Sequence, residues 1–213
     1  GFQGAGVFNM AKEAPGFQGA GVFNMAADVD SPLQAAGVFN MAKKVRGFQA
    51  AGVFNIAEEV SGGQAAGVFN IADKVRGVQV GLVNVAENID GIQIGLVNVA
   101  GNGVDSLGVL YEPETDWFYA QWQSGTPALF TVIGVGAPGA AWFEDWNEFS
   151  LFAGLGTRGR LLGVNINLDV CAVQSVAGLP SSREAWETEE AWESVVPYPS
   201  IRLMAGIPVF GRR

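Results

Sequence analysis

The first hundred residues of this chain repeat one short phrase seven times, at intervals of 14 to 16 residues. The phrase is clearest at 47–57, where it reads Gly-Phe-Gln-Ala-Ala-Gly-Val-Phe-Asn-Ile-Ala. A unit of this length cannot bury enough surface to fold alone, so the copies must lie side by side in one shared sheet. Every copy carries one Gln and one Asn at corresponding places: Gln3, Gln18, Gln34, Gln49, Gln64, Gln79 and Gln93, with Asn9, Asn24, Asn40, Asn55, Asn70, Asn84 and Asn98.

The apolar residues of a copy recur with a period of two. Phe48, Phe54 and Ile56 fall on one face of an extended chain, whereas Gln49 and Asn55 fall on the other. A period of two is typical of β-strands, and the enrichment in Val, Ile and Phe agrees with that assignment. The repeats are therefore predicted to form β-strands.

Pairs of a residue followed by glycine separate the apolar runs, as at 46–47, 76–77 and 90–91. Such pairs are typical of tight β-hairpins, whose central residues adopt positive φ. If each pair is a hairpin, the strands are about 12 residues long, which suits a tilted strand that crosses a membrane with ~9–11 residues.

The junctions also carry charges of alternating sign, with net −2 at 28–30, +3 at 43–46 and −2 at 58–59. In an antiparallel meander these charges lie on opposite rims, whereas in a parallel solenoid they stack along one edge. The last two copies are one residue shorter between Gln and Asn, so Asn84 changes face unless a β-bulge or a corner restores it. The last two copies therefore favour the solenoid, although both architectures stay open.

From about Gly103 the repeats stop, but alternating patterns predict six further strands near 107–112, 117–124, 128–136, 147–158, 161–176 and 200–211. A segment at about 178–199 is acidic and contains two Trp residues, and Ser181 with Glu184 matches a helix-capping pair. We predict a short helix in a solvated loop there. The chain thus divides into repeats at 1–103 and antiparallel strands at 104–213.

Composition narrows the class of protein further. Only 15% of the residues are charged, and the mean hydropathy is +0.23, so the surface is either largely covered or faces lipid. No apolar run is long enough for a transmembrane helix, but membrane-spanning strands remain compatible. The net charge of −9 and the lack of a basic stripe argue against a nucleic-acid partner.

The residue types needed for common catalytic sites are missing. The chain has no histidine, which excludes histidine-based nucleophilic triads and most zinc sites. The adjacent acids Glu144–Asp145 and Glu189–Glu190 are interpreted as solvated, and Cys171 as a small apolar strand residue. We predict no catalytic, cofactor-binding or metal-binding residues, no cofactor, and no enzymatic activity.

The phrase Gly-Ile-Gln-Ile-Gly-Leu-Val-Asn-Val-Ala at 91–100 resembles a family of bacterial surface repeat proteins found in spirochaetes and Bacteroidetes. The run from Phe149 to Thr157 and the run from Leu162 to Asp169 are similar to the second half of that family. The resemblance covers most of the chain. It implies a location in the bacterial envelope and supplies no catalytic residues.

Together these patterns predict an all-β fold, with the repeats and the later strands closed into one antiparallel β-barrel of outer-membrane type. The alternative is an N-terminal β-solenoid over 1–103, joined to an antiparallel sheet. The corresponding functions are a structural or pore-like protein of the bacterial outer membrane or cell surface, made as a secreted precursor, or a soluble or secreted solenoid acting as a structural, adhesive or assembly module. Expected partners are outer-membrane lipid, other envelope proteins and further copies of the chain.

The Gln and Asn of the repeats are the residues we expect to matter most. In a pore they would line the lumen while Phe faced lipid. In a structural solenoid they would form ladders while Phe packed inward. We predict the structural ladder, with Asn55 and Asn70 at equivalent depth in neighbouring strands, and expect Asn55→Leu to lower stability by about 1–3 kcal/mol.

Overall fold

The computed structural model describes residues 1–113, 116–139, 148–161, 164–177 and 197–206. These residues form strands and turns, so the predicted all-β class is confirmed. Among them there is no helix of the length and apolar character needed to cross a membrane. The helix predicted after Ser181, and residues 178–196 of the acidic loop predicted over about 178–199, lie outside the described residues, while the last residues of that loop begin the strand Tyr198–Gly206.

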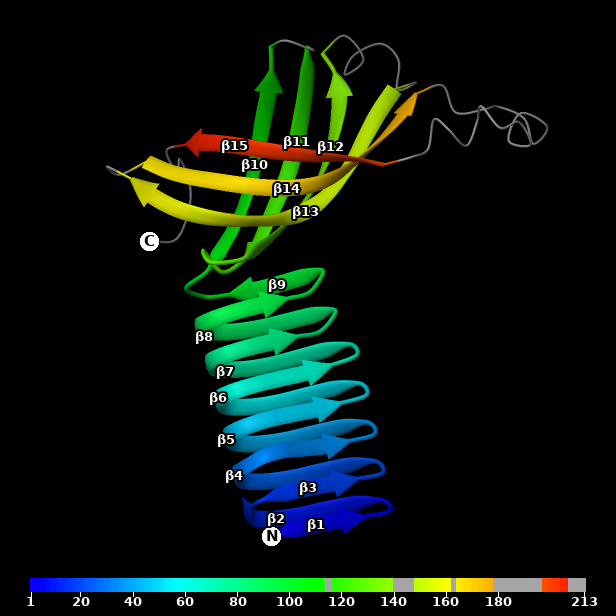
Figure 1. Ribbon diagram of the computed structural model, residues 1–213, viewed down its shortest axis with the longest axis vertical. Coiled ribbons are helices and arrows are strands. Elements are labelled where there is room, and N and C mark those ends of the chain that lie inside the picture. The colour runs from blue at the N-terminus through cyan, green and yellow to red at the C-terminus, as the bar shows by residue number, and fades with distance from the viewer. Residues whose placement is uncertain (114–115, 140–147, 162–163, 178–196, 207–213) are drawn as a thin grey trace, which may run out of the picture. The chain divides into compact units, whose positions relative to one another are not determined.

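The repeats form a parallel β-solenoid in which each coil stacks on the one before (Figure 1). Equivalent residues of successive copies pair directly, as Asn40 does with Asn55 and Asn55 with Asn70. The single antiparallel barrel is therefore wrong, and the solenoid alternative is confirmed. The strands are β1 (Phe2–Ala5), β2 (Phe8–Pro15), β3 (Phe17–Ala20), β4 (Phe23–Ala36), β5 (Phe39–Ala51), β6 (Phe54–Ala66), β7 (Phe69–Val80), β8 (Val83–Ile94) and β9 (Val97–Ala100).

The predicted hairpins are corners within a coil. Gly47 and Gly62 have positive φ angles of 127° and 130°, as a turn glycine should, but β5 and β6 continue through them. A Cβ on Gly62 would lie 2.2 Å from the carbonyl oxygen of Gly47 in the preceding coil. Positive φ marks a hairpin turn and a solenoid corner alike, so this signal could not separate them.

The extra and missing residues of the longer and shorter copies lie at corners and turns of the coils. In the longest copy the register shifts between Ser31 and Leu33, so the extra residue lies at a corner. In the shorter copies β7 ends at Val80, and the missing residue falls in the turn that leads to β8. Asn84 consequently stays opposite Asn70 and is fully buried.

Small side chains fill the interior of the solenoid between the two amide rows. Ala42 and Val45 of one coil stack on Ala57 and Val60 of the next, and all four are buried. Because the inward positions alternate along each strand with outward ones, every large side chain next to an inward residue must point out. The narrow core thus determines which side chains form the surface.

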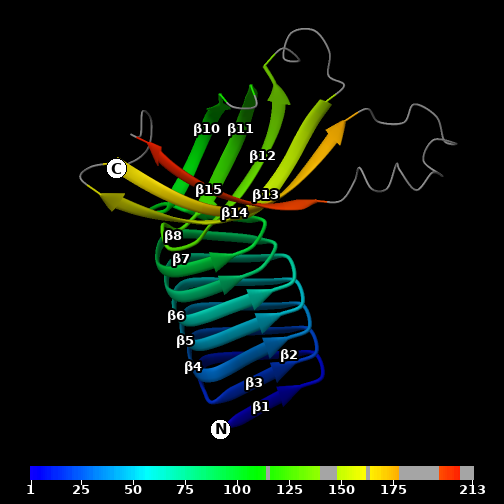
Figure 2. The same cartoon turned by 45° about the horizontal axis from the view of Figure 1, so that its top comes forward.

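The second half forms a separate sheet in the antiparallel order β10-β11-β12-β13-β14-β15 (Figure 2). Its six strands lie within a few residues of those predicted. They are β10 (Val104–Glu112), β11 (Trp117–Gly125), β12 (Phe130–Pro138), β13 (Glu148–Leu161), β14 (Val164–Ala177) and β15 (Tyr198–Gly206). By contacts, residues 1–104 with 124–130 make one compact unit and residues 105–123 with 131–213 the other.

Candidate functional site

The repeat asparagines form a continuous hydrogen-bonded row along the solenoid. Each Asn side chain donates through Nδ2 to Oδ1 of the Asn in the following coil, at 2.8–2.9 Å. The row begins at Asn9 and ends at Asn98. It ties every coil to its neighbour through side chains, in addition to the backbone ladder.

The same Asn side chains also brace each coil across its interior. Nδ2 of Asn55 donates to the carbonyl oxygen of Ala65 at 2.8 Å, and Nδ2 of Asn70 donates to that of Val80 at 2.8 Å. Asn24 does the same with Ala35 at 2.7 Å. One carboxamide thus joins two coils and satisfies a carbonyl near the next turn, which a leucine of similar size could not do.

The repeat glutamines form a second row that runs in the opposite direction. Nε2 of Gln64 donates to Oε1 of Gln49 in the preceding coil at 2.9 Å, and the pattern extends from Gln93 to Gln3. The donors of the Asn row point toward later coils, whereas those of the Gln row point toward earlier ones. The two rows of amide dipoles therefore oppose each other, which limits the net dipole along the solenoid. At the end of the Gln row, Oε1 of Gln93 is buried without a hydrogen-bond partner in the described part of the chain.

Neither row faces water. The Gln side chains from Gln18 to Gln93 and the Asn side chains from Asn24 to Asn98 are at most 2% exposed. The structure thus brings the candidate residues together as two dry rows, with only the terminal Gln3 and Asn9 less buried. This arrangement leaves no water-filled lumen between them.

The repeat phenylalanines do not pack inward, contrary to the expectation for a structural solenoid. Phe8, Phe23, Phe39, Phe54 and Phe69 point outward and stack ring on ring, with centroids 4.9–5.1 Å apart and planes within 5°. The physical reason is the period of two: Asn occupies the next position inward, and the apolar core beside it consists of Ala and Val with one Ile, Ile89. Parallel in-register strands ~4.8 Å apart hold the rings in this face-to-face stack.

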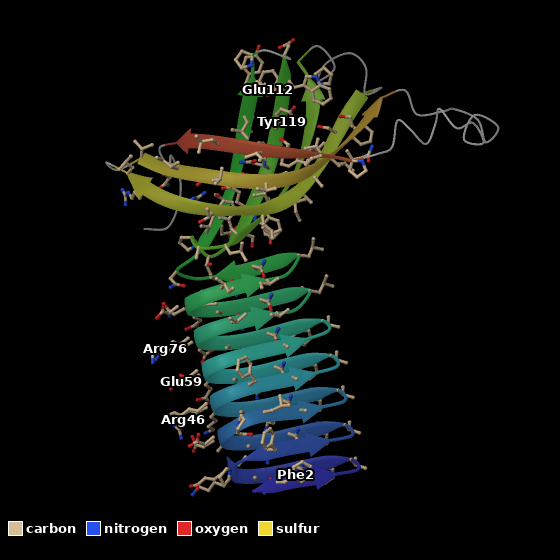
Figure 3. All side chains as sticks on the ribbon, in the orientation of Figure 1. Phe2, Arg46, Glu59, Arg76, Glu112 and Tyr119 are labelled. Atoms are coloured by element: carbon tan, nitrogen blue, oxygen red, sulfur yellow. The ribbon has the colours of Figure 1, made fainter. Side chains whose placement is uncertain are left out.

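Charged side chains gather along one edge of the solenoid, where Arg46, Glu59 and Arg76 are seen in Figure 3. The register places Lys44 between Asp28 and Glu59, so opposite signs stack along this edge. The ion pairs Arg46–Asp30, at 3.6 Å, and Lys74–Glu59, at 3.7 Å, are largely exposed. Each contributes little to stability at physiological salt, on the order of 0–1 kcal/mol.

A second polar cluster lies in the C-terminal sheet, and the sequence patterns did not reveal it. Asp169 is fully buried, and its Oδ2 lies 3.4 Å from Nη2 of Arg202. Arg202 also contacts Sγ of Cys171 at 3.3 Å and lies over the ring of Phe152, 4.3 Å from its centroid. The contact depends on the pairing of β14 with β15, which no local pattern encodes.

Removing one partner of this ion pair should destabilise the C-terminal sheet. We expect Asp169→Leu to lower its free energy of unfolding by about 3 kcal/mol, because the Arg202 guanidinium loses its buried carboxylate. Asp169→Leu combined with Arg202→Met should recover most of the loss. Denaturation followed by Trp fluorescence measures both, and equal losses in the single and double variants would contradict a specific pair.

No group of three potential metal-ligating side chains occurs in the described ranges. Glu144, Asp145, Glu189 and Glu190 lie outside those ranges. Cys171 is a buried free thiol. The only extended constellation of functional groups that the structure assembles from the predicted residues is therefore the pair of amide rows.

Comparison with protein-family models, with curated proteins and with solved structures finds no match to this chain. The fold, its side-chain rows and the sequence patterns are thus the basis for any functional inference.

Proposed function

We propose that this chain is a non-enzymatic structural protein whose β-solenoid acts as a stiff module of adjustable length. The observation that carries the proposal is the pair of buried amide rows, in which every coil is joined to the next by the same two side-chain hydrogen bonds. The hydrogen bonds in this interior hold successive coils together, and the interior leaves no space for a substrate. Stability in such a repeat array is roughly the sum of coil and interface terms, so coils can be added or removed.

The outward columns of the solenoid support an assembly role. Met41, Val68 and Ile71 represent outward columns of apolar side chains and are 36%, 42% and 37% exposed. Exposed apolar side chains that form a contiguous patch are typical of interaction surfaces. Charged side chains, among them Lys43 and Glu58, border the column that contains Met41. We therefore favour a structural or assembly module over a pore, because the amide groups that would line a lumen are bonded to one another.

The cellular location is part of the proposal. The resemblance of residues 91–100 to surface repeat proteins supports the bacterial outer membrane or cell surface, with envelope components as partners. The low fraction of charged residues, 15%, is consistent with that setting.

Deleting one whole coil tests the structural role. Asn70 and Asn84 occupy equivalent positions, so removing residues 70–83 joins Phe69 to Asn84 and preserves every column. We expect a folded protein in which spin labels at positions 12 and 87, originally about 24 Å apart along the axis, come about 5 Å closer. Electron paramagnetic resonance measures the distance.

The matched control removes half a coil, residues 70–76, which sets inward and outward columns out of register. That variant should lose the cooperative melting of the solenoid. If the whole-coil deletion were equally damaging, the proposed role would be wrong.

A further inference from the structure

We infer that the outward face of the β10–β15 sheet binds the hydrocarbon of a lipid bilayer. This contact is independent of the structural role proposed for the solenoid and concerns the other unit of the chain. It follows from the polarity of the sheet's two faces, from its curvature and from the side chains at the ends of its strands.

The outward face is apolar on both the first and the last strands. Leu107 and Val109 on β10 are 86% and 75% exposed, and Ile201 and Leu203 on β15 are 75% and 74% exposed. Between them, further exposed apolar side chains follow β13 and β14: Leu151, Leu155, Leu168 and Val170. In water, this much exposed aliphatic surface is unfavourable, at roughly 25 cal/mol per Å².

The opposite face carries buried polar groups together with the rings of Tyr119 and Phe152. Arg158 donates from Nη2 to Oε1 of Gln123 at 2.6 Å, and Ser106 donates to the same oxygen at 3.1 Å. Asp169 and Arg202 also belong to this face. The charged groups thus lie on the buried face and the large aliphatic groups on the exposed one, whereas in a water-soluble sheet packed on a core the exposed face is the polar one.

The sheet is bent around its polar face. Side chains of β11 and β13 touch across the intervening β12, with Arg158 bonded to Gln123 and the rings of Tyr119 and Phe152 5.9 Å apart. Gln123, Phe152 and Asp169 on this side are at most 3% exposed, so the sheet folds around this face and makes it concave. Figures 1 and 2 show the curved course of β13 and β14. The apolar face is therefore convex.

Aromatic residues with hydrogen-bonded polar ends flank the apolar band on β10 and β11. At one end Trp122 donates from Nε1 to Oδ1 of Asp105 at 2.9 Å. At the other end the Tyr111 hydroxyl donates to Oδ1 of Asp116 at 3.0 Å. Aromatic side chains with one apolar and one polar end favour the boundary between hydrocarbon and water. The six-residue step from 105 to 111 spans about 20 Å, near the ~25 Å apolar band of known membrane-spanning strands.

Lipid fits this face better than a second protein does. Two convex faces meet only along a narrow line, so a second copy would leave most of the exposed leucines and valines in water. Acyl chains are fluid and follow a curved surface. The charges whose side chains are described also avoid the face: Asp169, Arg158, Arg160 and Arg202 lie on the concave side, and Asp105 and Glu112 lie at strand ends.

Contact with hydrocarbon imposes a condition on the outer strands of the sheet, β10 and β15. An unpaired strand edge is costly in lipid because its backbone groups find no water. Pairing β15 of one copy with β10 of the next satisfies both edges. We therefore expect the lipid-bound chain to be oligomeric.

Flotation with vesicles of phosphatidylethanolamine and phosphatidylglycerol tests the inference. The full chain should float with the vesicles and cross-link there as oligomers, whereas Leu107→Asp with Val109→Asp should reduce the floating fraction at least tenfold. The matched control, Met41→Asp with Ile71→Asp, places the same charges on partly exposed apolar positions of the solenoid and should float like the unchanged chain. Deleting the coil 70–83 should also leave flotation unchanged.

A second measurement avoids any effect of the charged variants on folding. With Cys171 replaced by Ala, a polarity-sensitive dye on Val109→Cys should shift to the blue on addition of vesicles, while the same dye on Lys43→Cys should not. The inference is overturned if the full chain stays in the aqueous fraction, if it floats only as a monomer, if both double-aspartate variants lose flotation equally, or if the dye at position 109 does not respond.

Discussion

Replacing Asn55 by Leu should lower the free energy of unfolding of the solenoid by about 3 kcal/mol. The substitution keeps the size of the side chain but removes its bonds to Asn40, Asn70 and the Ala65 carbonyl. These partner groups are buried, so no water replaces Asn55 as their hydrogen-bond partner. Each group left without a partner costs roughly 1–3 kcal/mol if the surrounding structure does not rearrange. Chemical denaturation of the purified chain, followed by circular dichroism, measures the loss.

Asn88→Leu is the matched control, because Asn88 lies in the same solenoid on its exposed edge. The same chemical change there should alter stability by less than about 0.5 kcal/mol. If the two substitutions had equal effects, the Asn row would not be the source of cohesion between the coils.

Gly62→Ala should be at least as damaging, with a loss of about 3 kcal/mol or more. Residue 62 has a φ of 130°, a conformation that L side chains rarely adopt. Its new methyl group would also meet the Gly47 carbonyl oxygen at 2.2 Å. Relieving that contact requires neighbouring coils to separate, which breaks the backbone ladder at the corner.

Gly19→Ala provides the comparison within the same solenoid. A Cβ on Gly19 has no heavy atom within 4 Å, and the equivalent position in the next coil is Ala35. We expect this substitution to be neutral or to stabilise by several tenths of a kcal/mol through the lower entropy of the unfolded chain. Thermal melting of the two variants side by side would show whether the corner or glycine content in general matters.

Strand formation was predictable from the alternation of apolar and polar residues along the sequence. The alternation of Phe48, Gln49, Phe54 and Asn55 shows directly which residues share a face. The shorter spacing from Gln79 to Asn84 correctly favoured a corner over a bulge, because the structure places the missing residue in a turn. Local periodicity contains this information, since it depends only on how one strand is pleated.

Strand direction was not predictable in the same way. The stacking of Lys44 on Glu59 suits a parallel solenoid, but the same alternation of charge also suits a meander. Gly47 has the positive φ that is typical of a hairpin turn, but it lies at a corner of a solenoid coil. The outward position of Phe54 contradicts the usual preference for burying phenyl rings, because the amides of Asn and Gln occupy the narrow core as bonded rows. The Asp169–Arg202 pair required knowledge of a long-range register.

Exchange of the side-chain amide protons tests the buried rows most directly. Nuclear magnetic resonance in deuterated water should show the carboxamide protons of Asn55 and Asn70 persisting for hours and giving cross-peaks to each other, since their groups bond at 2.9 Å. The exposed carboxamide of Asn88 should exchange within the dead time and serves as the internal reference. Equally fast exchange at all three residues would mean that the repeat amides face water, and the account of a solenoid held together by bonded rows would be wrong.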